Sequence, residues 1–99
     1  MSARRIYISG AIKNDPDYRG KFATHEHKLS VHDGYEVVNP CTLPHPEGAT
    51  YEDFMREDIR AMLDCDEIGM IPGWELSAGA KLEFLVATMC GITVRFLPP

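Results

Sequence analysis

The 99-residue sequence contains few cysteines, little positive charge and no long apolar run. Its three cysteines are odd in number and widely spaced, which argues against a disulfide framework or a zinc site and favours a reducing compartment. Ten basic and fifteen acidic residues leave a net charge of −5, which argues against nucleic acid or an anionic membrane as a partner. Because no secretory signal or membrane-spanning segment is visible, we expect a cytoplasmic protein.

Four short runs rich in strand-forming residues alternate with three helical patterns. The expected strands are residues 4–9, 35–39, 67–71 and 92–97. The expected helices run from Asp15-Pro16 to Val31, from Thr50 to Leu63, and from Ser77 to the residue before Gly91. Strands that are joined through helices should be parallel, with right-handed crossovers. The sequence therefore predicts one domain, residues 1–99, with a small doubly wound α/β sandwich fold of the flavodoxin or Rossmann type and strand order 2-1-3-4.

In such a fold, ligands bind beyond the carboxyl ends of the strands, at the point where the strand order reverses. Here that point lies between the first and third strands. The loops that meet there are residues 10–14 and 72–76. They are flanked by residues 39–49, which are stiffened by Pro40, Pro44 and Pro46. We therefore expect the functional residues to come from these loops and from the helix ends beside them.

The third helix carries a glutamate that its apolar pattern does not explain. The pattern predicts a core stripe of four side chains: Leu82, Leu85, Val86 and Met89. Glu83 lies beside this stripe on an uncharged face, one turn after Gly79. Since glycine has no side chain, a ligand could rest on Gly79 and meet the Glu83 carboxylate. The alternative is a glutamate at the margin of the core, with its head group in water.

The second helix carries a carboxylate within its apolar stripe. The predicted buried face consists of Tyr51, Phe54, Met55, Ile59, Met62 and Leu63. Asp58 lies among them, and an unpaired carboxylate there would be desolvated and have a raised pKa, which fits a general acid. The alternative is an aspartate paired with Arg4, Arg5 or a backbone N–H. Two carboxylates in one cleft suit chemistry at an anomeric carbon, where one acts on the oxocarbenium-like centre and the other protonates the leaving group.

Further candidates lie around the cleft. The first loop offers backbone N–H groups and one cation, which suit a phosphate, although an ordinary turn is the alternative. Its residues are Ser9, Gly10, Ala11, Ile12 and Lys13. Tyr7 could orient Glu83 or belong to the core, and Trp74 could stack on a base or pack against the domain. Asn39 begins the flanking loop. His45 in that loop could reach a ligand, but the four histidines lack the spacing of metal ligands, so we expect no metal and no cofactor.

Three segments together resemble the nucleoside 2-deoxyribosyltransferase superfamily, in particular its 2′-deoxynucleoside 5′-monophosphate N-glycosidases and its short, often phage-borne, uncharacterised members. Residues 7–13, YISGAIK, resemble the family's Y-x-x-G-S-I-R segment. Residues 58–66, DIRAMLDCD, resemble its D-x7-D segment. Residues 77–83, SAGAKLE, resemble its S-x-G-x-x-x-E segment. The three occur in the family's order, on the elements expected above.

The resemblance implies roles for these residues. Glu83 would attack C1′ of the deoxyribose, Asp58 would assist departure of the base, and Tyr7 would orient Glu83. Four residues would surround the 5′-phosphate or the sugar: Gly10, Ile12, Lys13 and Ser77. Three features depart from the family. Ala11 replaces its serine, and Gly73-Trp74-Glu75 adds an aromatic side chain and a charge where the family's loop varies. The sequence also ends at Pro99, whereas family enzymes continue past the fourth strand and use later residues, often in a neighbouring subunit's site.

Two functions are consistent with these observations. The first is an N-glycosidase or deoxyribosyltransferase that acts on a nucleoside 5′-monophosphate or nucleoside, without a cofactor and as a homodimer or higher oligomer. The second is a non-catalytic nucleotide-binding module of the same fold. A phospho-receiver domain shares the fold, but Ser9-Gly10 and Pro72-Gly73 occupy the places where it needs its acidic residues.

Overall fold

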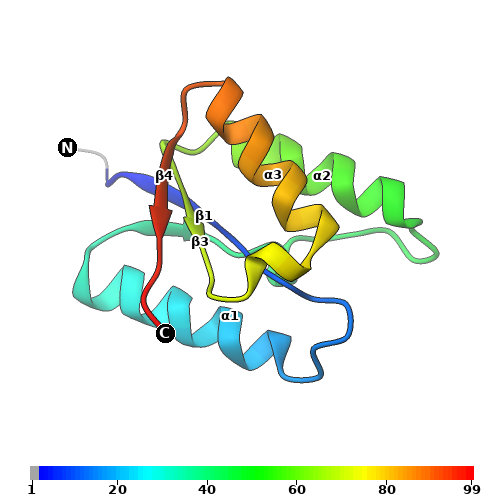
Figure 1. Ribbon diagram of the computed structural model, residues 1–99, viewed down its shortest axis with the longest axis horizontal. Helices are drawn as coiled ribbons and strands as arrows, with labels where there is room; N and C mark the ends of the chain where they lie inside the picture. The colour runs from blue at the N-terminus through cyan, green and yellow to red at the C-terminus, as the bar shows by residue number, and fades with distance from the viewer. Residues whose placement is uncertain (1–2) are drawn as a thin grey trace.

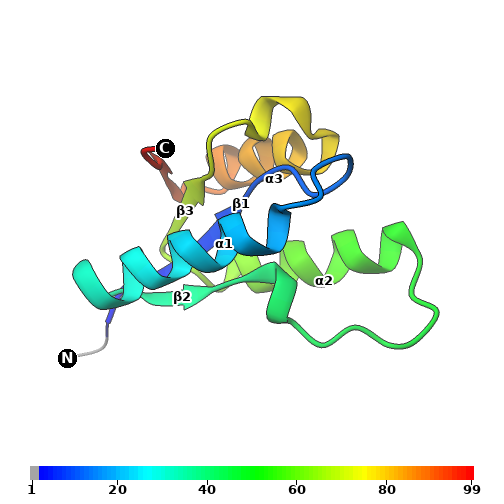
Figure 2. The same ribbon diagram turned by 90° about the horizontal axis from the view of Figure 1, so that it is seen from below.

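The computed structural model describes residues 3–99 and contains a four-stranded parallel sheet with strand order β2-β1-β3-β4. Helix α1 covers one face of the sheet, and helices α2 and α3 cover the other (Figures 1 and 2). The elements are β1 (Arg5–Ser9), α1 (Tyr18–His27), β2 (Glu36–Val38), α2 (Tyr51–Leu63), β3 (Glu67–Met70), α3 (Ala78–Met89) and β4 (Thr93–Phe96). The predicted fold class, strand order and set of three helices are confirmed.

Strand β1 lies in the middle of the sheet, and its alternating side chains supply both faces. Ile6 and Ile8 pack under α1 with Phe22. Tyr7 points to the other face and joins the core beneath α2 and α3. Ser9 shares that face with Tyr7, since it follows two residues later. Polar groups from β1 are thereby delivered to the space between the sheet and α3.

The helix boundaries follow local capping chemistry. Thr50 and Asp53 form the predicted capping box at the start of α2, and Ser77 caps α3 by accepting a hydrogen bond from the Ala80 N–H. Helix α1, however, begins at Tyr18 rather than at Asp15-Pro16. The Asp15 carboxylate accepts hydrogen bonds from the Asp17 N–H and the Lys21 ammonium, and so closes a turn ahead of the helix. Within residues 3–99, no helix is long and apolar enough to span a membrane.

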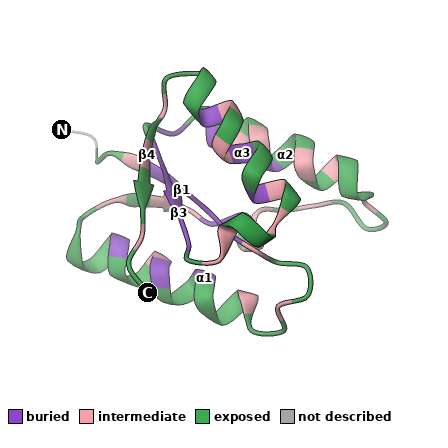
Figure 3. Ribbon diagram, viewed as in Figure 1, coloured by how far each residue is buried: buried purple, intermediate pink, exposed green. Residues whose placement is uncertain are grey.

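The core stripe predicted on α3 is wrong at three of its four positions. Leu85 and Met89 are 52% and 78% exposed, and Leu82 is exposed as well, whereas Val86 is half-buried and packs against the core. The buried residues of α3 are Ala80, Glu83 and Ala87 (Figure 3). Helix α3 turns its small residues inward because they allow close approach to the sheet and to α2. Glu83 therefore lies in the middle of the buried face, and the larger apolar side chains form an outer α3 stripe (Leu82, Leu85 and Met89).

The predicted buried face of α2 is correct only in part. Met62 is fully buried, but Tyr51, Phe54 and Leu63 are exposed. Only part of the helix lies over the sheet, because its first turns extend beyond the strands alongside the loop that precedes it (Figure 2). Asp58 remains buried, at the position where α2 meets this loop.

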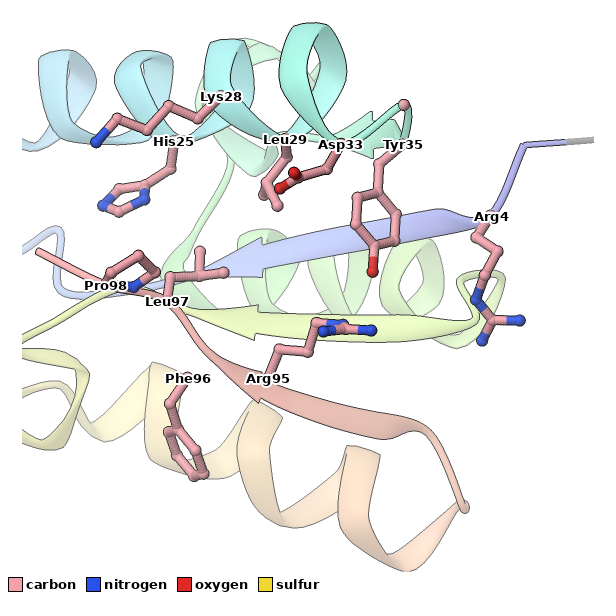
Figure 4. A pocket seen from close by; sticks show the side chains of 11 residues that line it. Arg4, His25, Lys28, Leu29, Asp33, Tyr35, Arg95, Phe96, Leu97 and Pro98 are labelled. Carbon is pink, nitrogen blue, oxygen red and sulfur yellow. The ribbon is translucent and has the colours of Figure 1, made fainter.

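On the α1 face, the buried carboxylate of Glu67 is fully paired. It accepts hydrogen bonds from Arg4 Nε at 2.6 Å, from the Tyr35 hydroxyl at 2.8 Å, and from Arg95 Nε. Burial opposes its ionisation, but these bonds outweigh burial and lower the pKa of Glu67. Figure 4 shows Arg4, Tyr35 and Arg95 along a cavity of about 580 Å³ between α1 and β4. This cavity lies on the face of the sheet opposite to Glu83.

Candidate functional site

The Glu83 carboxylate lies between α3 and the carboxyl end of β1. The Tyr7 hydroxyl donates to Glu83 Oε2 at 2.7 Å, and the Ser9 hydroxyl donates to Glu83 Oε1 at 2.7 Å. The residue is 6% exposed. The contact expected between Tyr7 and Glu83 is therefore present, and the carboxylate is held at both oxygens.

The ionisation of Glu83 is strongly perturbed. Burial raises its pKa from 4.5 to about 7, although the hydrogen bonds from Ser9 and Tyr7 act in the opposite direction. None of the ion pairs formed within residues 3–99 involves Glu83. Burial, together with the neighbouring Glu83 charge, also raises the pKa of Tyr7 well above its usual value, so Tyr7 remains a hydrogen-bond donor at neutral pH. A buried carboxylate near its midpoint of ionisation is typical of catalytic sites.

Asp58 is the second carboxylate of the site, and its partner is a histidine. Its Oδ1 lies 3.3 Å from His45 Nε2, and the two side chains are 13% and 12% exposed. The pairing with Arg4 or Arg5 that the sequence left open does not occur, because Arg4 binds Glu67 and Arg5 lies near Glu36. Burial raises the pKa of Asp58, while His45 acts to lower it. Asp58 and Glu83 act on each other electrostatically, since the Asp58 charge raises the pKa of Glu83.

The space expected above Gly79 is filled. A Cβ atom at Gly79 would lie 3.3 Å from both the Tyr51 hydroxyl oxygen and Met55 Sδ. Gly79 therefore allows α2 and α3 to approach closely. Contact between Gly79 and a ligand stays a prediction that requires Tyr51 and Met55 to move. Because Glu83 lies one turn further along the same helix face, the same movement would open a way to its carboxylate.

The two loops at the switch point lie together, as the topology predicted. A Cβ atom at Gly10 would lie 3.0 Å from Ile71 Cβ, so this glycine permits the close approach of the loops that follow β1 and β3. A cavity of about 390 Å³ lies between these loops, and its lining includes Ala11 and Lys13. Ile12 is exposed beside them. Glu83 lines neither this cavity nor the larger one beside Glu67.

Two of the expected ligand contacts are engaged within the protein instead. The buried Asn39 side chain donates to Glu26 and accepts from the Cys41 N–H, so it caps the turn after β2. Trp74 stacks on Phe84, with ring centroids 4.9 Å apart, because this aromatic pair covers the core between α3 and β4. Packing accounts for the positions of Asn39 and Trp74, and contact of either residue with a ligand stays a prediction.

Two contacts were missed from the sequence. Ser9 was expected to hold substrate, whereas it holds Glu83; strict alternation along β1 places it on the Tyr7 face and could have revealed this. The contact between His45 and Asp58 joins a loop to a helix and leaves no periodic pattern in the sequence. Within the described residues, no three histidine, cysteine or acidic side chains are grouped to hold a metal ion. The chemistry available to the site is that of two buried carboxylates, two hydroxyls and an imidazole.

Comparison with solved structures identifies relatives of the fold. The 2-deoxyribosyltransferase of Bacillus psychrosaccharolyticus superposes with a TM-score of 0.70 at 21% identity, over 91% of this chain and 69% of that protein. A conserved protein from Enterococcus faecalis V583 superposes with a TM-score of 0.68 at 19% identity, over 94% of this chain and 62% of that protein. The expected resemblance to the nucleoside 2-deoxyribosyltransferase superfamily is thereby confirmed in the fold.

Sequence comparison gives the family. No curated protein sequence matches the chain. Residues 4–96 match the family DUF4406, which is described as a domain of unknown function. That match covers every strand and helix of the fold and both carboxylates of the site. The chain therefore belongs to the DUF4406 family.

Proposed function

We propose that the protein breaks the N-glycosidic bond of a nucleoside 5′-monophosphate or nucleoside, with Glu83 as the nucleophile. The observation that carries this proposal is the buried Glu83 carboxylate, which accepts hydrogen bonds from two hydroxyls and forms no ion pair with any residue of the range 3–99. A purely structural glutamate in this fold would be expected to be paired as Glu67 is. The likeness of the fold to a 2-deoxyribosyltransferase supports the same chemistry.

The proposed reaction uses both carboxylates of the site. A Glu83 oxygen forms a bond to C1′ while the bond from C1′ to the base breaks, and the electron pair of that bond passes to the base. Asp58 provides the proton that the departing base needs. Water then attacks C1′ of the glycosyl-enzyme to give hydrolysis, or a second base attacks to give transfer. Either acceptor releases Glu83 as a carboxylate.

Tyr7 and Ser9 prepare Glu83 for this attack. Their hydroxyls fix both oxygens of the carboxylate and stabilise its ionised form. Burial opposes that ionisation, and the pKa of about 7 is the outcome. At neutral pH a substantial fraction of the molecules thus carries an ionised Glu83 that is weakly solvated and hence a better nucleophile.

A phosphate is expected at the start of α3 and in the loop after β1. Ser77 caps α3, a helix of twelve residues whose N-terminal N–H groups favour an anion. Lys13 supplies a cation beside the neighbouring cavity. These features favour a nucleoside monophosphate over a free nucleoside. The cytosol, where free nucleotides are available, is the location that this proposal requires.

A non-catalytic nucleotide-binding module is the second candidate. It is favoured by the closure of the site, since Tyr51 and Met55 occupy the space at Gly79 and Glu83 is almost inaccessible. Such a module would bind nucleotide at the loops without contact between Glu83 and C1′. Release of free base separates the two candidates.

The first test is therefore base release by Glu83→Gln. Purified protein is incubated with each deoxynucleoside 5′-monophosphate, and free base is measured by chromatography. We expect release by the wild type and a loss of about a thousandfold or more in the variant, because the amide cannot attack C1′. Glu36→Gln, at the opposite end of the sheet, is the matched control and should retain wild-type activity. Absence of release from every nucleotide, or equal release by wild type and Glu83→Gln, would refute the proposed reaction.

The same variant should change how stability depends on pH. The pKa of Glu83 rises from 4.5 to about 7 on folding. Between these values the folded protein holds a proton that the unfolded chain has released, so wild-type stability falls as pH rises through this window. Glutamine removes this loss. The unfolding free energy, measured with urea, is compared between Glu83→Gln and wild type at each pH. From pH 4.5 to pH 8, the stability of the variant relative to wild type should rise by about 3 kcal/mol. A difference that does not vary with pH would show that Glu83 ionises normally.

We also propose that the protein self-associates through the outer α3 stripe. Three large apolar side chains on one helix face are exposed there, on the helix that carries Glu83. Leu85→Glu should convert a homodimer or larger oligomer into a monomer in sedimentation experiments at micromolar concentration. Val31→Glu, which changes an exposed apolar side chain on the α1 side, is the control and should leave the assembly intact. A monomeric wild type would contradict this proposal.

A further inference from the structure

His45 lies inside the candidate site, although it belongs to the loop between β2 and α2. Its ring packs on Phe54, with centroids 4.3 Å apart, and its Nε2 lies 3.3 Å from Asp58 Oδ1. Phe54 and Asp58 are four residues apart on α2 and thus share one face of the helix. The imidazole spans one turn of that face, with its ring tilted at 47° against the Phe54 ring and one nitrogen beside the Asp58 carboxylate.

The loop that carries His45 is held at both ends. Asn39 caps its first turn through the Cys41 N–H, and the Thr50–Asp53 capping box fixes its last residue to α2. Pro44 and Pro46 flank His45 on either side and restrict its backbone. His45 is therefore placed against Asp58 by a loop with few alternative conformations.

Within residues 3–99, no group other than His45 both contacts Asp58 and can carry a positive charge. Titratable groups act on Asp58, or feel its charge, from every element packed around it: Glu57 on α2, Tyr7 on β1, Cys41 after β2 and Glu83 on α3. All of these are neutral or anionic. His45 is thus the group that offsets the Asp58 charge in a site that also contains Glu83.

We propose that His45 is a positioning residue that acts through Asp58 and keeps one proton on the His45–Asp58 pair for the departing base. The inference rests on the proposed N-glycosidic cleavage. As the bond between C1′ and the base breaks, the base takes the electron pair of that bond and the single proton of the pair, which passes from His45 Nε2 through the Asp58 carboxylate to the base. This step leaves a neutral imidazole and an ionised Asp58. In the second step, water that bonds to C1′ returns a proton to the pair, while the bond from C1′ to Glu83 breaks and Glu83 leaves as a carboxylate.

Histidine suits this task better than a second carboxyl or a lysine. An imidazole ordinarily exchanges its proton near neutral pH, whereas an isolated carboxyl has lost its proton several pH units lower. Burial raises the pKa of Asp58 and so favours its protonated form, and His45 adds a second group that can hold the proton. The His45–Asp58 pair thus supplies the proton, while Glu83 supplies the nucleophile.

The decisive variant is His45→Gln. Its side-chain amide can donate a hydrogen bond to Asp58 but cannot titrate. We expect kcat for base release to fall by about a hundredfold at pH 8 and by much less at pH 6, with KM unchanged, so that the basic limb of the pH profile moves to lower pH. His32→Gln, at an exposed histidine away from the site, is the control and should keep the wild-type profile.

A second measurement needs no turnover. The imidazole NMR signals of His45, recorded at one pH, should shift in Asp58→Asn relative to wild type, because the carboxylate beside Nε2 is replaced by an amide. An unaltered pH profile in an active His45→Gln, or His45 signals that Asp58→Asn leaves unchanged, overturns this inference alone. A wild type that releases no base overturns the proposed reaction, and this inference with it.

Discussion

The carboxylate of Glu83 accepts hydrogen bonds from the Tyr7 and Ser9 hydroxyls in the interior of the protein, and it has no charged partner in the part of the chain that the structure describes. Glu67 shows what the alternative looks like. It is buried to a similar degree on the other face of the sheet, but Arg4 and Arg95 bind it, and its pKa is lowered rather than raised. Both glutamates have little exposed surface, but they differ in their partners and in their depth: the arginines that bind Glu67 are themselves exposed and line a cavity, whereas Glu83 lies in the interior. An unpaired buried carboxylate costs stability, and such a cost is typical of sites where function requires it.

The positions of both hydroxyls and of the carboxylate follow from the packing of β1 and α3. Strand β1 is central, so its alternation delivers Tyr7 and Ser9 to the α3 face. Helix α3 can bring Glu83 against them because the residues it turns inward, Ala80 and Ala87, are small. The same choice leaves Leu82, Leu85 and Met89 outside. The buried position of Glu83 and the apolar outer surface are thus two consequences of one helix orientation.

The sequence was sufficient to predict the fold because each strand and helix carried its own local evidence, such as the capping box at Thr50 and the cap at Ser77. It was also sufficient to single out Glu83 and Asp58. The orientation of α3 was mispredicted because Leu, Val and Met form an apolar stripe as regular as the small residues that are buried. His45 and the filling of the space at Gly79 could not be foreseen, since both depend on contacts between segments far apart in the chain.

If Glu83 forms a covalent bond to C1′ during the reaction, mass spectrometry can detect that bond directly. A deoxynucleoside 5′-monophosphate with fluorine at C2′ withdraws electrons from C1′ and slows hydrolysis of the glycosyl-enzyme, so that it accumulates. After incubation and proteolysis, we expect the peptide containing Glu83 to gain the mass of the fluorinated sugar phosphate, and the same peptide of Glu83→Gln to gain nothing. Base release from an unfluorinated nucleotide by an enzyme whose modified residue is not Glu83 would contradict this expectation.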